Sequence, residues 1–166
     1  MPKGPAARIF DPVKHKLPPV LIGGPTAITV WIGFLPAWRG VNPAVAATLQ
    51  AAKTISDAAI KTAETATKLA AGTPGAPAAK AAEELVKAGA AVAMGAAITS
   101  MAGGADIHAC LTLLPAPPHG PGVVITPSAT VMVSRMPAAR EGDTILEAVG
   151  PPNKIKKGYK TVVIGG

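Results

Sequence analysis

The segment DIHACLTLLPAPPHGPG, residues 106–122, decides how this chain can fold. It contains His108, Cys110 and His119, so two of the three histidines and the only cysteine of the 166-residue chain lie close together. The third histidine is His15. These four side chains form a His3Cys set, which has the number and type of ligands of a closed tetrahedral zinc site. We therefore predict one structural zinc ion bound by His15, His108, Cys110 and His119.

The same residues have a plainer interpretation, in which the histidines are unrelated surface residues and the thiol is buried. His-x-Cys is not a Cys-x-x-Cys pair, and the sequence contains no second pair of that kind. The internal repeats described below favour the zinc site over this alternative.

The composition favours many short elements over one aromatic core. Aromatic residues make up 3% of the chain, whereas it has 18 glycines and 18 prolines, as expected for short elements joined by tight turns. The formal net charge is +7, but the basic residues are spread along the chain and cluster only at Lys154, Lys156, Lys157 and Lys160. With one tyrosine and two phenylalanines there is little on which bases could stack. We expect no nucleic-acid partner.

The single cysteine excludes an internal disulfide and fits synthesis in a reducing cytoplasm. The N-terminus has no apolar core segment, so no Sec-type signal peptide is expected. The most apolar helical run, residues 88–101, is shorter than the roughly 18 residues of a membrane-spanning helix, so a membrane span is not favoured.

Short motifs recur along the chain. Residues 5–11 read PAARIFD, residues 137–143 read PAAREGD, and a degenerate copy, PAWRG, occupies residues 36–40. The β-branched runs TVWIG (29–33), TVMV (130–133) and TVVIG (161–165) recur with them. The repeats predict a mainly β fold, a small conical three-lobed structure with pseudo-threefold symmetry. His15 and His119 precede equivalent turns of the first two lobes, so the lobes would bring the ligands together.

A helical hairpin is expected to interrupt this β structure. Asn42-Pro43 is a favourable helix start, and apolar residues spaced by threes and fours predict a helix over residues 44–71. Residues 72–77 break it, and a second helix over 78–101 should end at Gly103-Gly104. Leu85 and Val92, and likewise Met94 and Met101, are spaced seven residues apart on this helix. The two helices should form an antiparallel hairpin with an alanine-rich, closely approaching seam. The chain then divides into a β cone, residues 1–41 and 104–166, and an autonomous insertion, residues 42–103, that is a solvated spacer or a binding surface for cargo or lipid.

The two PAAR motifs with Asp11 and Asp143, the Thr-Val strands and the His-x-Cys and His-Gly loops resemble the PAAR-repeat proteins. That resemblance covers residues 1–41 and 104–166. It implies a sharpened β cone that caps the trimeric spike of a contractile secretion apparatus such as type VI, with a metal, usually zinc, near its apex. It also implies that His15, His108, Cys110 and His119 are the metal ligands. The helical insertion departs from the simplest members of the family.

The leading hypothesis is therefore a non-enzymatic tip that is monomeric on its own and docks on a trimeric VgrG-like spike protein. We expect it in the cytoplasm before assembly and at the target cell after export, with no toxin domain following Gly166. An effector or accessory protein would bind the hairpin, and membrane contact would occur during delivery. The apolar base that meets the spike is expected among seven residues, Ile28, Val30, Ile32, Val131, Val133, Val162 and Ile164, some of which must be core.

Two other classes of function remain as alternatives. A zinc hydrolase would keep an open ligand position, but the four predicted ligands use every histidine and cysteine and leave only Asp106 or Asp11 as a general base. A membrane-acting effector is the second alternative, with a helical insert that inserts into or binds lipid.

Overall fold

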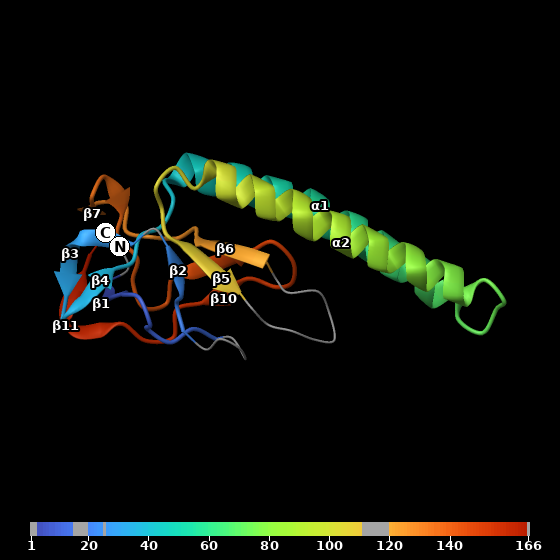
Figure 1. Cartoon of the computed structure of the whole chain (residues 1–166), viewed down its shortest axis with the longest axis horizontal. Helices are drawn as coiled ribbons and strands as arrows, with labels where there is room; N and C mark the ends of the chain where they lie inside the picture. Colours follow the sequence, from blue (N-terminus) through green and yellow to red (C-terminus); the bar gives the residue numbers. More distant parts are fainter. Residues whose placement is uncertain (1–2, 15–19, 25, 111–119, 166) are drawn as a thin grey trace.

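The structure is a computed structural model that describes residues 3–14, 20–24, 26–110 and 120–165. It has a mixed α/β architecture in which a long helical hairpin projects from a group of small antiparallel sheets. Both chain ends lie at the end of the molecule opposite the hairpin turn (Figure 1). The expected combination of small sheets and a helical hairpin is confirmed, and the fold class is mixed α/β rather than mainly β.

The largest sheet among the described residues has five strands in the order β10-β9-β6-β5-β2. Three two-stranded sheets accompany it, formed by β1 with β11, β3 with β4 and β7 with β8. The strands run as follows: β1 Gly4–Ala6, β2 Gly23–Gly24, β3 Ala27–Ile32, β4 Leu35–Ala37, β5 Ile107–Cys110, β6 Gly120–Val124, β7 Met132–Val133, β8 Met136–Pro137, β9 Thr144–Glu147, β10 Asn153–Lys154 and β11 Tyr159–Ile164. The three Thr-Val runs predicted as strands fall on β3, β7 and β11, although β7 is only two residues long.

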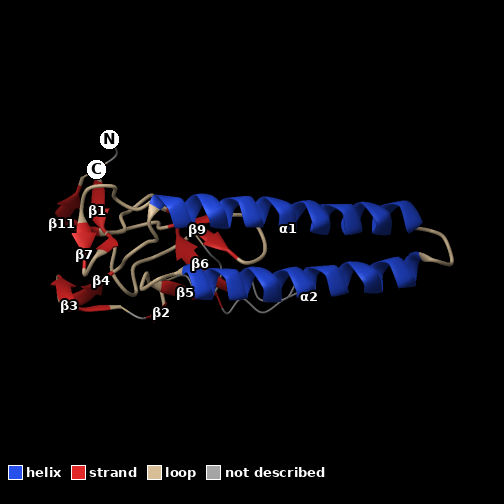
Figure 2. Ribbon diagram, turned by 90° about the horizontal axis from the view of Figure 1, so that it is seen from above, coloured by secondary structure: helices blue, strands red, loops and turns tan. Residues whose placement is uncertain are grey.

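The helices are α1, Pro43–Ala70, and α2, Ala76–Met101. Asn42 caps α1, because its side-chain oxygen accepts a hydrogen bond of 2.9 Å from the Val45 N–H. Gly103 and Gly104 both adopt positive φ after α2 and turn the chain back to the sheet. The two helices lie side by side and antiparallel (Figure 2), so the predicted hairpin and its limits are confirmed.

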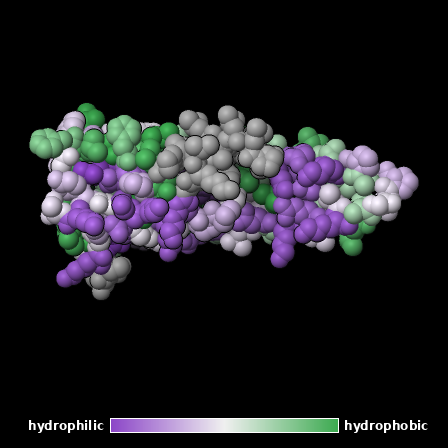
Figure 3. All heavy atoms as spheres, turned by 90° about the horizontal axis from the view of Figure 1, so that it is seen from below, coloured by the Kyte–Doolittle hydropathy of each residue, from purple (hydrophilic) through white to green (hydrophobic). Residues whose placement is uncertain are grey.

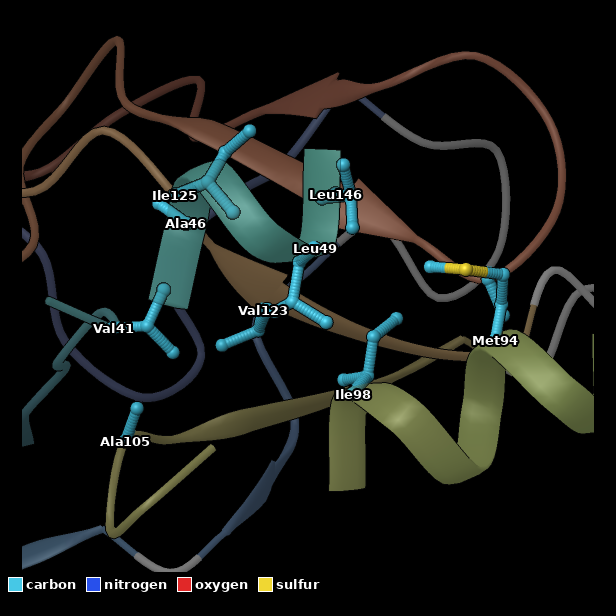
Figure 4. Close-up of a cluster of buried hydrophobic side chains, with 10 residues drawn as sticks. Val41, Ala46, Leu49, Met94, Ile98, Ala105, Val123, Ile125 and Leu146 are labelled. Atoms are coloured by element: carbon cyan, nitrogen blue, oxygen red, sulfur yellow. The ribbon is translucent and has the colours of Figure 1, made fainter. Parts of the chain in front are cut away.

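One face of the five-stranded sheet packs against the base of the hairpin. Leu49 of α1 and Ile98 of α2 are fully buried against Val123 of β6 and Leu146 of β9 (Figure 4). Met94, one helical turn before Ile98 on α2, belongs to the same cluster. The expectation of an autonomous insertion is therefore wrong for the base of the hairpin, since the first two turns of α1 and the last turns of α2 carry side chains of the shared core. The alanine-rich composition concealed this, because few large apolar residues mark the contact.

The two pairs of α2 residues spaced by seven differ in burial. Met94 is buried and Met101 is half-buried at the base of the hairpin, whereas Leu85 and Val92 are exposed. A heptad pair lies on one side of a helix but does not specify which side meets the partner. The Thr67 hydroxyl of α1 donates to the Ala79 oxygen of α2 at 3.1 Å, so the helices approach closely at this point, as expected of an alanine-rich seam.

The opposite face of the sheet and the paired strands enclose two further clusters. Val124 and Ile145 of the sheet pack with Leu21, Ile155 and the fully buried Trp38. Small residues near the chain ends form the other cluster, with Val133 and Ile164 as its largest members. The sheet therefore separates a hairpin-covered face from a face that carries His108.

Candidate metal centre and docking end

The structure describes one predicted metal ligand completely. His108 lies on β5 and its side chain is 1% exposed. The backbone of Cys110 ends the same strand, paired with Gly120, while its side chain lies outside the described part of the chain. His15 and His119 also lie outside the described residues. The four-ligand site accordingly stays a prediction.

Glycines flank His108 on both neighbouring strands. Gly23 of β2 and Gly122 of β6 are its direct cross-strand partners. The His108 Nδ1 atom accepts a hydrogen bond of 3.4 Å from the Ile22 N–H. Because neither glycine has a side chain, the imidazole has no direct cross-strand side-chain neighbour in this row.

The described ends of the segments that carry the other predicted ligands reach the five-stranded sheet at β10 and at β6. The Lys14 N–H donates to the Lys154 oxygen at 2.8 Å, which places the residue before His15 beside β10. Gly120, the residue after His119, pairs with Cys110 on β5. Within the described residues no group of three or more His, Cys, Asp or Glu side chains is arranged to hold a metal ion. The buried imidazole between glycines and the soft donor set are compatible with zinc at this position.

Sequence reasoning missed a buried carboxylate on the same sheet. Glu147 ends β9, is 1% exposed and accepts a hydrogen bond of 3.4 Å from the Asn153 side chain. It follows the apolar residues Ile145 and Leu146 and precedes Ala148. A charged residue inside an apolar strand was the available signal, because such residues are rarely buried without a partner.

Three arginines each hold an aspartate in the same geometry. In each pair the arginine backbone N–H donates to Oδ2 of the aspartate and the guanidinium Nη2 donates to Oδ1. The backbone bonds are 2.7, 2.8 and 2.7 Å long, and the Nη2–Oδ1 bonds are 2.9, 2.8 and 3.1 Å long. The pairs are, in order, Arg8–Asp11, Arg39–Asp106 and Arg140–Asp143.

The middle pair shows where the hairpin enters the fold. Asp11 and Asp143 each follow their arginine by three residues, whereas Asp106 follows Arg39 by 67. The helical hairpin therefore lies inside the middle Arg–Asp loop, whose two ends the Arg39–Asp106 pair holds together. The PAWRG copy was recognisable in the sequence, but no aspartate follows it closely. Asp106 was considered only as a possible general base. Its fully buried ion pair with Arg39 removes it from that role.

Burial affects two of these carboxylates. Burial raises the pKa of Asp106, although hydrogen bonds and the positive charge of Arg39 act in the opposite direction. Burial likewise raises the pKa of Asp143, against the influence of Arg140. Desolvation penalises the charged form of a carboxylic acid, so both aspartates depend on their arginine to remain ionised.

The three arginine-containing segments are joined by a closed ring of backbone hydrogen bonds. Ala7 N–H donates to the Ala139 oxygen at 2.9 Å, Ala139 N–H donates to the Trp38 oxygen at 2.9 Å, and Trp38 N–H donates to the Ala7 oxygen at 2.8 Å. All three residues are buried. Each segment thus gives and receives one bond in the same relative position.

The end of the molecule that holds β3, β7 and β11 exposes large apolar side chains. Phe34, in the β3–β4 turn, is 92% exposed and adopts a φ of 67°. The other exposed members are Ile28, Trp31, Met132, Val162 and Val163. Apolar residues are visible at this end in Figure 3. Of the seven base residues predicted, Ile28 and Val162 are exposed, Val133 and Ile164 are buried, and the others are half-buried; Phe34 and Trp31 were missed.

The hairpin has a second apolar surface away from the sheet. A groove of about 510 Å³ runs along one side of the helix pair between Ile55 of α1 and Val86 of α2, lined mainly by alanine and glycine. Among the described residues, α2 is the helix long and apolar enough to cross a membrane by length and composition, and 17% of its most apolar window is buried. The apolar run predicted from sequence, residues 88–101, was too short, because the apolar part of α2 extends further toward the N-terminus of that helix.

No known protein family, no curated protein and no solved structure matches this chain. The class of protein is therefore inferred from the sequence motifs, the site and the fold.

Proposed function

We propose that the chain is a metal-stapled tip that caps the trimeric spike of a contractile secretion apparatus, of the kind that the PAAR motifs suggest. The observation that carries the proposal is the closed ring of hydrogen bonds among Ala7, Trp38 and Ala139. A single chain with three equivalent segments around one axis fits the end of a threefold trimer only once. The conical shape and the pseudo-threefold axis belong to this proposal, and the three matching Arg–Asp pairs support it.

The docking surface in this proposal is the apolar end around Ile28, Trp31 and Phe34. Phe34 is almost fully exposed and yet keeps a left-handed backbone that disfavours a bulky side chain. Exposed aromatic residues are frequent anchors of protein interfaces. Short strands with free edges lie at the same end, where a β-structured spike could continue them.

The proposed metal would be bound by His15, His108, Cys110 and His119. A structural zinc ion supplies folding free energy, on the order of 10 kcal/mol in small metal-dependent domains. Cys110→Ser replaces a thiolate by a hydroxyl that stays protonated near neutral pH, so metal affinity should fall sharply. Unchanged metal content and thermal stability in this variant would exclude the site.

The docking proposal is tested with a matched pair of variants. Ile28 at the apolar end is 76% exposed and Ile55 on the hairpin is 74% exposed, so a charge is tolerated equally well in the free chain at either place. The chain is mixed with the trimeric spike protein of the same organism and the mass of the complex is measured by light scattering. We expect one chain per trimer, loss of the complex with Ile28→Glu and an intact complex with Ile55→Glu. Three chains per trimer, or equal effects of both variants, would overturn the proposal.

A second candidate function is membrane contact through the hairpin. The apolar composition and the exposure of α2 favour this function. The hairpin projects away from the apolar end (Figure 1), so a tip docked by that end would present the hairpin turn first. Purified chain added to dye-loaded liposomes tests this function. Dye release that is abolished by Leu85→Glu supports it, and the absence of release leaves the hairpin as a spacer or cargo site.

A further inference from the structure

Three strands place His108 and Glu147 on one row of the sheet. His108 of β5 pairs with Gly122 of β6, and Gly122 pairs with Glu147 of β9. Directly paired residues of an antiparallel sheet have their side chains on the same face. The two ionisable side chains therefore share a face, with a glycine between them.

The Glu147 side chain extends over that glycine. A Cβ atom added to Gly122 would lie 3.0 Å from Cγ2 of Ile145 and 3.2 Å from Cγ of Glu147, so these two side chains together fill the space that a larger residue would need. On its other side, His108 directs Nδ1 toward the Ile22 N–H of the β2 edge. The second ring nitrogen thus points away from β2.

The described neighbours of two further predicted ligands adjoin the strands on either side of β9, which carries Glu147. Lys14, the residue before His15, donates its N–H to the Lys154 oxygen of β10 at 2.8 Å, and Asn153 of the same strand donates to Glu147. Gly120, the residue after His119, lies on β6 two residues before Gly122, which pairs with Glu147. These neighbours therefore lie beside β10 and on β6, the two strands that pair with β9.

Charge balance gives the carboxylate a role. A zinc ion bound by one thiolate and three neutral imidazoles keeps a net charge of +1, and a buried net charge is strongly unfavourable unless it is compensated. Carboxylates next to metal-binding histidines also fix the orientation of the ring. Glu147 is buried and lies on the face of His108, two strands away, so its negative charge meets the first requirement, and the second is part of the proposal that follows.

We propose that Glu147, held by Asn153, is the charge-balancing and positioning carboxylate of the metal centre and not one of its ligands. The inference rests on the proposed metal-stapled tip. The inference adds a carboxylate, Glu147, to a motif that consists of three histidines and one cysteine.

The test compares Glu147→Gln with the wild type in zinc affinity and in melting temperature with and without zinc. Zinc affinity is measured by competition with a chromophoric chelator. We expect affinity to fall by about 10- to 100-fold, the usual effect of removing such a partner. Without metal the variant should be as stable as the wild type or more so, because glutamine removes a buried charge and keeps the shape. Glu141→Gln is the control, since Glu141 accepts the Gly158 N–H away from this row.

A purely structural role of Glu147 would instead lower the melting temperature equally with and without zinc, and that result would overturn the inference, as would unchanged affinity. Asn153→Ala provides a second variant if Glu147→Gln does not fold; it keeps the carboxylate but removes its described donor, and a smaller loss of affinity is expected. No loss in that variant would then overturn the inference. A wild type that binds no zinc would overturn the proposed metal centre as well, whereas a zinc-binding wild type with an unaffected variant overturns only the role of Glu147.

Discussion

Aspartates in three copies of one motif allow the contribution of burial to be measured residue by residue. Arg39 and Asp106 are almost fully buried, whereas the Arg8 side chain is 15% exposed. Arg8 also donates to the Ile32 and Gly33 oxygens and lies 4.3 Å from the centre of the Tyr159 ring. A guanidinium in the Arg8 position therefore keeps favourable contacts when its carboxylate is removed.

We expect Asp106→Asn to lower the free energy of unfolding by about 3 to 5 kcal/mol, the range for removing one partner of a buried ion pair. Asp11→Asn should have a clearly smaller effect, because Arg8 is more exposed and retains its other contacts. Denaturant unfolding of the two variants measures both values. Equal losses would mean that burial of the pair does not determine its contribution.

Phe34 provides a residue-scale test that separates stability from docking. The β3–β4 turn requires positive φ at Gly33 and Phe34, a conformation that glycine adopts without steric penalty. Since the Phe34 side chain is exposed, Phe34→Gly loses little burial and should raise the free energy of unfolding by up to about 1 kcal/mol. The same variant should weaken binding to the spike trimer. Thermal unfolding and light scattering check the two effects, and a variant that is less stable or binds equally well would contradict the role given to Phe34.

At the scale of elements, an ion-pair network joins the two helices. Lys87 of α2 contacts Glu64 of α1 at 2.8 Å and Glu83 at 2.6 Å, and Lys80 contacts Glu83 at 3.0 Å. Hydrogen bonds from Lys87, then Lys80 and Thr67, lower the pKa of Glu83 to about 2. A carboxylate with a lowered pKa stabilises the folded state above its unfolded pKa, here 4.5, and this contribution disappears as the pH falls through about 2.

We therefore expect Glu83→Gln to lower the melting temperature at neutral pH but to reduce the further loss between pH 4.5 and about 2. Melting temperatures across this pH range check the expectation. Glu84→Gln is the control, because Glu84 is half exposed and contacts only Lys80 among the described ion pairs. Parallel pH profiles for the wild type and Glu83→Gln would show that these hydrogen bonds do not stabilise the ionised form of Glu83.

The elements were predictable from sequence to different degrees. The hairpin could be predicted, because its limits are marked locally by Asn42, by the break at residues 72–77 and by Gly103-Gly104. The five-stranded sheet could not be, since strands of two residues such as β2 and β10 have no periodicity to detect. The partner of Arg39 was also hidden, because an insertion of two helices separates it from Asp106. The sequence marks Glu147 as a charged residue in an apolar strand, but its place on the row of His108 follows only from the pairing of β5, β6 and β9.

On the scale of the whole molecule, the hairpin belongs to two environments. Its base contributes Leu49, Met94 and Ile98 to the core shared with the sheet. Further out, contacts run between the helices themselves, such as the Glu64–Lys87 ion pair. This division contradicts the simple separation into cone and appendage and predicts that the two parts of the hairpin respond differently to deletion.

We expect replacement of residues 44–102 by a short Gly/Ser linker to unfold the chain or leave it marginal. Burial of a large apolar side chain contributes about 1.5 to 3 kcal/mol, so losing Leu49, Met94 and Ile98 removes about 5 to 9 kcal/mol from a typical total of 5 to 15 kcal/mol. Replacing only residues 60–88 by the native turn, residues 71–75, removes whole interhelical pairs and keeps all three core residues. The free energy of unfolding of that shortened chain should lie within about 2 kcal/mol of the wild-type value, since the length of a connection has a small effect on stability. Denaturant unfolding of both deletions decides the matter, and a full deletion as stable as the shortened one would show that the hairpin base is dispensable to the core.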